Sequence, residues 1–249
     1  MSEMPAAMAI ARQSVRLMRA EWASLLTMLV MPLILMTIFL PVARDALHDA
    51  GFHGATGAEQ VVPGMTVGFG LFLLGFVAFG FLNERTWRTE ERVRATAARP
   101  MDIVLGKLVP SFGLAVAYQV VLFVLGAVLF GLRVRGNPFA LVLVTPAFAA
   151  SIVAIGIFVA SVATRPQQVN ATSNICGLGL SALGGAYVPI ALLPLWMQRI
   201  APITPTYWAV KGLRVAFLPG ASMATALSAT GVLLALALAF VLASARRLR

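Results

Sequence analysis

Charged residues are scarce in this sequence, at 11% of the chain against 60% hydrophobic residues. Six long stretches contain no Asp, Glu, Lys, Arg or His: residues 22–43, 61–83, 108–132, 139–164, 171–195 and 215–245. A helix rises about 1.5 Å per residue and a bilayer core is about 30 Å thick, so each stretch is long enough to cross a membrane. The sequence therefore excludes an ordinary soluble domain and predicts an integral membrane protein.

Cysteine and histidine are almost absent. The one cysteine, Cys176, cannot form an intrachain disulfide, and its apolar surroundings favour a buried, inert thiol. Both histidines lie in the loop at 44–60, whose ionisable side chains beyond its first residue are Asp45, His48, Asp49, His53 and Glu59. That spacing is compatible with a divalent cation, but glycine-rich polar loops more often only meet water, and we expect no metal.

The apolar stretches also lack the groups that membrane catalysis requires. Without Asp or His inside them, neither a protease centre nor a proton relay can be built there. The phosphate-binding pattern GxxxxGK[ST] is missing, since Gly106-Lys107 is followed by Leu108. The connections are too short to hold a separate folded domain, so energy for any transport must come from a gradient or from another polypeptide.

The net charge of +10 is explained by membrane topology rather than by nucleic acid. If the N-terminus is cytoplasmic, 13 of the 19 Lys and Arg residues fall in cytoplasmic segments, as the positive-inside rule requires. With an even number of spans, both termini are then predicted to be cytoplasmic.

The predicted fold is all-helical, a single transmembrane domain over residues 1–249. Six spans are expected at 22–43, 61–83, 108–132, 139–164, 171–195 and 223–245. Residues 1–21 carry an apolar stripe edged by Arg12, Arg16 and Arg19, which predicts an amphipathic helix in the membrane interface, with a disordered basic leader as the alternative. The prolines and aromatic residues at 196–222 predict short external half-helices between spans five and six.

The most polar connection is the cytoplasmic segment 84–107. Glu84 precedes Arg88, and Glu90 precedes Arg94, by four residues, which is the favourable order for ion pairs on a helix. We expect a helix that continues beyond the membrane until Pro100 stops it, after which Asp102 caps a short turn before span three. The alternative is a solvated turn with the usual positive bias.

The same segment carries a family resemblance. Glu90-Glu91-Arg92, Arg99-Pro100-Met101-Asp102-Ile103 and Gly106-Lys107, together with the proline-rich stretch 189–207, resemble ABC-2 type permeases of ATP-binding-cassette exporters. The likeness is greatest to permeases of the daunorubicin-resistance type. The resemblance implies two ATP-binding-cassette ATPase subunits as partners and a second permease copy, identical or paralogous, with ATP and Mg²⁺ held by the ATPase and no cofactor on this chain.

The resemblance also assigns sites. It implies that the interfacial helix and the segment after span two contact the ATPase, through Arg12, Arg16, Arg19, Glu84, Arg88, Glu90, Glu91, Arg92, Arg94, Arg99 and Asp102. In this fold spans two and five are expected to line a path between protomers, which points to Phe69, Phe72, Phe76, Phe79, Asn170, Asn174 and Tyr187. A phenylalanine stripe of this kind is also typical of side chains that merely pack or face lipid.

The expected function is thus the permease subunit of an exporter in a bacterial cytoplasmic membrane. Its cargo would be a hydrophobic or amphipathic compound such as a drug, a lipid or a polyketide-like metabolite, for which uncharged aromatic walls are suited. The alternatives are export of a glycan or lipid-linked polymer, a gradient-driven carrier, which the missing intramembrane charges disfavour, and a membrane scaffold without a transport role.

Overall fold

The computed structural model describes residues 12, 16, 22–86 and 100–247; for residues 22, 24, 25, 83–86, 100–105 and 107 it describes the backbone alone. Every regular element within these ranges is a helix, which confirms the all-helical class. Five segments are long and apolar enough to cross a membrane: Leu26–Asp49, Ala58–Leu82, Leu108–Phe130, Phe139–Val162 and Met223–Arg247. They correspond to predicted spans one, two, three, four and six.

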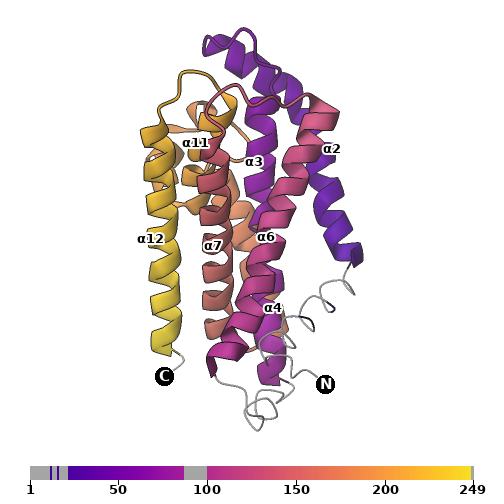
Figure 1. The fold of residues 1–249 in the computed structure, drawn as a ribbon, viewed down its shortest axis with the longest axis vertical. Coiled ribbons are helices and arrows are strands. Elements are labelled where there is room, and N and C mark those ends of the chain that lie inside the picture. Colours follow the sequence, from indigo (N-terminus) through magenta and orange to yellow (C-terminus); the bar gives the residue numbers. More distant parts are fainter. Residues whose placement is uncertain (1–11, 13–15, 17–21, 87–99, 248–249) are drawn as a thin grey trace, which may run out of the picture.

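The long helices are α2 (Trp22–Asp49), α3 (Ala58–Gly70), α4 (Leu73–Thr86), α6 (Pro100–Phe130), α7 (Phe139–Val162) and α12 (Met223–Arg247). Shorter elements lie between α7 and α12: α8 (Pro166–Ile175), the π-helical turn η1 (Cys176–Leu180), α9 (Ser181–Leu183), η2 (Ile190–Leu192), α10 (Leu195–Ile200), η3 (Ala201–Ile203) and α11 (Pro205–Phe217). Figure 1 shows the long helices standing roughly side by side along the longest axis.

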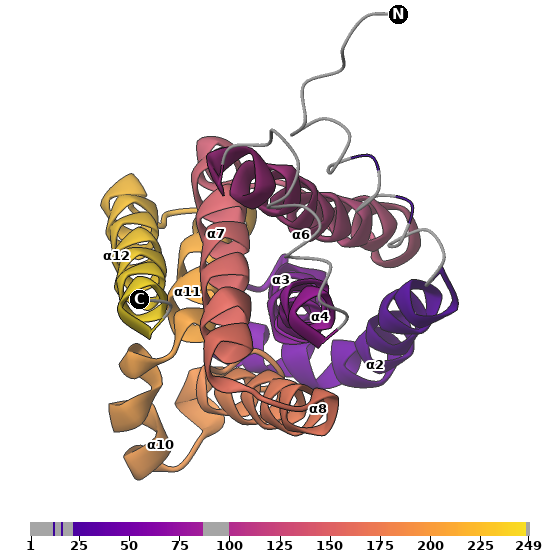
Figure 2. The ribbon, with the colours of Figure 1, turned by 90° about the horizontal axis from the view of Figure 1, so that it is seen from below.

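Helices α3 and α4 form the centre of the bundle. Seen along the bundle in Figure 2, they are surrounded by α2, α6, α7 and α8. Every residue of α3 except Phe69 is buried, and the core continues into α7 through Phe148 and Ile152, which are fully covered. A helix that is apolar all round fits this central position, because it meets protein on every side.

The outer helices show the opposite distribution. Helices α2, α6 and α12 expose large aliphatic side chains along their length, among them Ile38, Val128 and Leu238. In water such faces would be aggregation sites, whereas in a bilayer they meet hydrocarbon. The exposure pattern therefore agrees with a membrane-embedded bundle.

Side-chain hydrogen bonds join the helices inside this apolar core. The Ser151 hydroxyl of α7 donates to the Leu233 carbonyl of α12 at 2.9 Å. The Gln119 amide of α6 donates to the Thr145 carbonyl of α7 at 3.2 Å. Interhelical bonds of this kind stabilise membrane bundles by about 0.6 kcal/mol on average.

The fifth predicted span, a single helix over 171–195, is wrong in both bounds. The helical segment begins earlier, at Pro166, and passes through the π-helical turn η1 to end at Leu183. Gly185 has φ +74°, a left-handed conformation that glycine adopts without strain, so the chain turns away there. Pro189 and Pro194 then confine the following residues to turns and the short helix η2.

The start of span three also differs from the prediction. Helix α6 begins at Pro100 and runs without interruption to Phe130, so there is no separate turn capped by Asp102. Proline suits the first turn of a helix, where its missing N–H has no partner to lose. Asp102 accordingly lies inside the first turn of α6.

Short helices do occupy the stretch predicted as half-helices, but α11 is no surface element. It packs against α3, α7 and α12, and Ala209, Leu213 and Ala216 are fully buried. The hydroxyl of Thr204 accepts a hydrogen bond from the Tyr207 N–H at 3.3 Å and so caps the helix start. In Figure 1, α11 lies at the end of the bundle that also holds the α2–α3 and α6–α7 connections.

Candidate functional site

The central span is broken near the middle of the bundle. Helix α3 ends at Gly70 and α4 begins at Leu73. At the break the Phe72 N–H bonds the carbonyl of Phe69 at 3.1 Å, three residues back, instead of that of Gly68. The Gly68 carbonyl receives a hydrogen bond from the Ser181 hydroxyl of α9 at 3.0 Å. A neighbouring segment thus satisfies a carbonyl that the break left free.

A second irregularity lies beside the first. The π-helical turn η1 packs against α3, and Gly177 faces Phe72 so closely that an added Cβ would come within 2.9 Å of its ring. π-Helical turns are rare and occur often at functional sites. Two irregular segments therefore meet at one level of the bundle, which the residue pattern of the sequence did not predict.

Aromatic rings gather at this meeting point. The rings of Phe69 and Phe72 have centroids 5.8 Å apart, and Phe69 meets Tyr187 edge to face at 6.1 Å. Phe76 and Phe79 continue along α4, and all four phenylalanines are partly exposed, whereas Leu71, Leu73 and Leu74 beside them are buried. We refer to Phe69, Phe72, Phe76, Phe79 and Tyr187 as the aromatic face.

The two asparagines predicted for the same path lie elsewhere on the surface. Asn170 and Asn174 are exposed on α8, and none of the described contacts links them to the aromatic face. Next to them Ile175 and Leu178 are 72% and 57% exposed. The structure thus brings Tyr187 to the phenylalanines but leaves the asparagines on a partly apolar outer face of α8 and η1.

The predicted ATPase-contact residues fall mostly outside the described part of the chain. Arg88, Glu90, Glu91, Arg92, Arg94 and Arg99 lie outside it, as does Arg19. Glu84 belongs to α4 and Asp102 to α6, with the backbone alone described. Arg12 and Arg16 are themselves helical and exposed, and the rest of the predicted interfacial helix before α2 lies outside the described residues.

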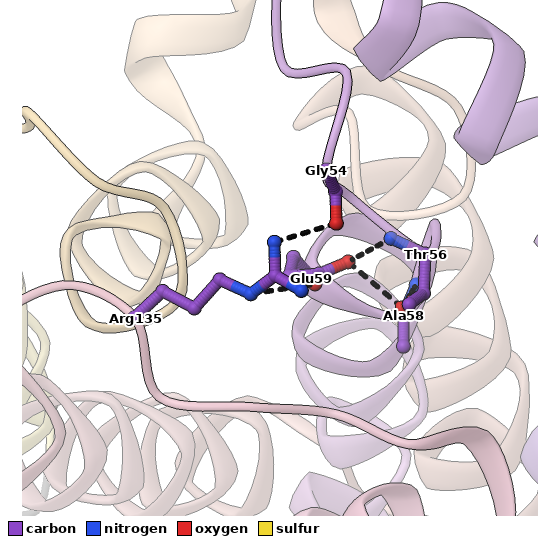
Figure 3. A network of polar contacts seen from close by, with 5 residues as sticks. All are labelled: Gly54, Thr56, Ala58, Glu59 and Arg135. Atoms are coloured by element: carbon purple, nitrogen blue, oxygen red, sulfur yellow. Dashed lines mark hydrogen bonds and ion pairs between the residues drawn. The ribbon is translucent and has the colours of Figure 1, made fainter.

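A polar network fastens the loops at the opposite end of the bundle (Figure 3). The fully buried Glu59 carboxylate accepts hydrogen bonds from the Thr56 N–H and hydroxyl, both at 3.0 Å. Its other oxygen lies 3.9 Å from the Nε of Arg135, which also donates to the Gly54 carbonyl. Arg135 comes from the α6–α7 connection, so the network joins two loops.

The spacing of threonine and glutamate in the sequence could have predicted this network. Thr56-Gly57-Ala58-Glu59 has the spacing of a capping box, but the helix begins at Ala58 with Gly57 at its cap, so the Glu59 carboxylate bonds back to the residue before the cap. The acids and histidines of this loop were weighed only as possible metal ligands, and the loop was otherwise expected to be solvated. No group of three metal-ligating side chains occurs among the described residues.

A cavity of about 450 Å³ lies at the same end, between α11, the turn after α9 and the α11–α12 loop. Lys211 and Arg214 of α11 line it together with Gln60 of α3. Burial lowers the pKa of Arg214 below its usual value, although a guanidinium stays protonated at neutral pH. The cavity is therefore cationic.

Comparisons with known proteins agree with this architecture. Residues 6–218 match the family model of the ABC-2 type transporter membrane domain. Over 130 residues the chain is 32% identical to the linearmycin resistance permease protein LnrN of Bacillus subtilis (strain 168), an alignment that covers 48% of this chain and 34% of LnrN. The chain thus spans about a third of that relative's length. Because the family model covers most of the sequence, the chain belongs to the ABC-2 type transporters, as a multi-pass membrane permease domain.

Proposed function

We propose that this chain is the permease subunit of an ATP-driven exporter of a hydrophobic or amphipathic compound, such as a drug, a lipid or a polyketide-like metabolite. Family membership supports the transport role, and the linearmycin resistance role in the name of LnrN supports an antibiotic-like cargo. The observation that carries the cargo class is the aromatic face, an uncharged surface at the break between α3 and α4. Apolar and aromatic walls are what binding sites for such molecules use.

The proposed assembly has two permease copies on two ATP-binding-cassette ATPase subunits in a bacterial cytoplasmic membrane. ATP and Mg²⁺ would be bound by the ATPase, since this sequence has no phosphate-binding loop. The segment α8–η1–α9 is 18 residues long, about 27 Å of helix, and would form the sixth crossing with slight local thinning of the bilayer. Its exposed face around Ile175 and Leu178 would meet the second copy.

Uptake into inverted vesicles tests the cargo site. With the partner ATPase coexpressed, wild-type vesicles should accumulate a fluorescent hydrophobic antibiotic when ATP is supplied. Phe72→Ala and Phe69→Ala should lower the initial rate at least fivefold, because they remove rings from the aromatic face. Phe139→Ala is the matched control, since Phe139 is 68% exposed at the start of α7, and it should leave the rate within about a quarter of wild type. Equal losses in all three variants would contradict the cargo site.

Charge reversal tests the coupling segment separately. The double variant Glu90→Lys/Glu91→Lys should release the ATPase during copurification while the permease still elutes as a folded species. The matched control is Asp45→Lys/Asp49→Lys, which reverses two exposed acids in the last turns of α2, at the opposite end of the bundle, and should retain the ATPase. Retention and normal stimulation of the ATPase by the first variant would refute the assignment. Accumulation driven by a pH gradient without ATP would refute the exporter itself.

A further inference from the structure

The cationic cavity beside α11 is not part of the aromatic face. Its basic side chains, Lys211 and Arg214, stand three residues apart on α11, so they project from one side of that helix. The Gln60 side chain reaches the same cavity from α3. Groups from two distant parts of the sequence thus converge on one space.

The positive charge of this cavity has no described counter-ion. The carboxylates that the structure describes with their side chains are Asp45, Asp49 and Glu59, and Glu59 pairs with Arg135. None of these three lies within ion-pair distance of Lys211 or Arg214. Burial of a guanidinium without an acidic partner costs desolvation free energy, unless an external anion pairs with its charge.

Gln60 adds an independent sign of an absent partner. Its side chain is 3% exposed, and its Oε1 atom has no hydrogen-bond partner among the described residues. Buried amide oxygens in folded proteins almost always accept a hydrogen bond. The cavity therefore offers two cations for an anion and, close by, one acceptor for a hydroxyl donor.

The surroundings suit a ligand that is partly apolar. Ile190, Val210 and Leu218 line the cavity beside the charged groups. Lys211 lies over the rings of Tyr207 and Trp208, with its Nζ 5.3 and 5.1 Å from their centroids. Aromatic and basic side chains in company are typical of the membrane–water interface. Helix α12, which contributes Thr225 to the wall, exposes aliphatic side chains such as Leu227 along its length.

We propose that this cavity binds the glycerol phosphate headgroup of an anionic phospholipid. Arg214 and Lys211 hold the phosphate, a headgroup hydroxyl donates to Gln60, and the acyl chains lie against the aliphatic surface of α12. Charge-assisted bonds from arginine to phosphate are strong and directional, so Arg214 is the principal contact. The site is independent of which compound is exported.

Binding of short-chain lipids to the purified full-length chain in detergent tests this proposal. Titration with dihexanoyl phosphatidylglycerol, followed by native mass spectrometry and by tryptophan fluorescence, should saturate. Dihexanoylglycerol, which has the same chains without phosphate, should bind at least tenfold more weakly. Arg214→Gln should weaken phosphatidylglycerol binding at least tenfold, and Lys211→Gln and Gln60→Leu about threefold each, with dihexanoylglycerol binding unchanged.

Controls separate loss of the site from loss of the fold. Arg199→Gln removes an exposed arginine of the nearby α10 and should bind phosphatidylglycerol within twofold of wild type. Lys211→Gln alters an exposed side chain, so it tests the site even if Arg214→Gln fails to fold. Equal binding of the two lipids, or an unchanged affinity in Lys211→Gln and Gln60→Leu, would overturn the phosphate site. Glycerol 3-phosphate or inorganic phosphate binding as tightly as the lipid would overturn the phospholipid as the source.

Discussion

Replacement of Glu59 offers the sharpest test of how the loops are held. Its carboxylate has two kinds of partner: the Thr56 N–H and hydroxyl at hydrogen-bond distance, and the Arg135 guanidinium at 3.9 Å. The second distance is too long for a hydrogen bond, so that contact is electrostatic only. Glu59→Ala removes both, whereas Glu59→Gln keeps an oxygen that can accept from Thr56 and removes the charge.

The expected magnitudes differ clearly. Hydrogen bonds to a charged acceptor contribute about 1.5–3 kcal/mol, so Glu59→Ala should reduce the free energy of unfolding by about 2–3 kcal/mol. The Arg135 side chain is 33% exposed, and a partly solvated ion pair contributes less than about 1 kcal/mol. Glu59→Gln should therefore cost no more than about 1 kcal/mol. Both variants also remove the desolvation cost of the buried charge, so their difference reports the bonds to Thr56 together with the side-chain packing that alanine lacks.

Thermal unfolding in detergent, followed by tryptophan fluorescence, measures the difference. At about 2–4 °C per kcal/mol for a chain of this size, Glu59→Ala should lower the melting temperature by about 4–12 °C and Glu59→Gln by less than about 4 °C. A double-mutant cycle that combines Arg135→Gln with Glu59→Gln should give a coupling energy below about 1 kcal/mol. If Glu59→Gln proves as harmful as Glu59→Ala, the ion pair dominates, and the larger role given to the Thr56 hydrogen bonds is refuted.

Two further predictions concern the packing of the bundle. Gly156→Ala should destabilise the protein by about 1–3 kcal/mol, because the added Cβ would come within 2.7 Å of Val77. Gly231→Ala on α12, where an added Cβ meets no atom within 4 Å, should be neutral or slightly stabilising. The melting temperatures of the two variants test this difference. Ser181→Ala should lower the free energy of SDS-induced unfolding by about 1–2 kcal/mol, because it leaves the Gly68 carbonyl unpaired. Ser228→Ala, on the exposed face of α12, should lower it by less than about 0.5 kcal/mol. If the two variants of either pair were equally stable, the packing of that part of the bundle would be contradicted.

Hydropathy predicted most of the fold, because a bilayer requires long uncharged helices. Five of the expected spans are present, with ends displaced by a few residues. The sequence was less informative where helices break without a charge or a proline. Leu71 and Phe72 separate α3 from α4, yet both residues are compatible with a continuous helix.

The fifth span shows the same limit in another form. Apolar residues continue to Leu195, but the helix ends at Leu183 and the chain turns at Gly185, where Gly184 lies so close to Thr206 that an added Cβ would lie 1.9 Å from its hydroxyl oxygen. That contact joins residues 22 positions apart, so no local pattern reveals it. Likewise the phenylalanine stripe was visible in the sequence, whereas the place of Tyr187 beside it depends on the turn at Gly185.

The Ser181–Gly68 hydrogen bond limits how the two irregular segments can move. If α9 withdrew from α3, the Gly68 carbonyl would be left with neither a helical donor nor water, at the cost of about 1–2 kcal/mol expected for Ser181→Ala. Rearrangements that open the bundle should therefore keep the two irregular segments together, and movement is better sought at contacts that this bond does not fasten, such as the exposed outer face of α8.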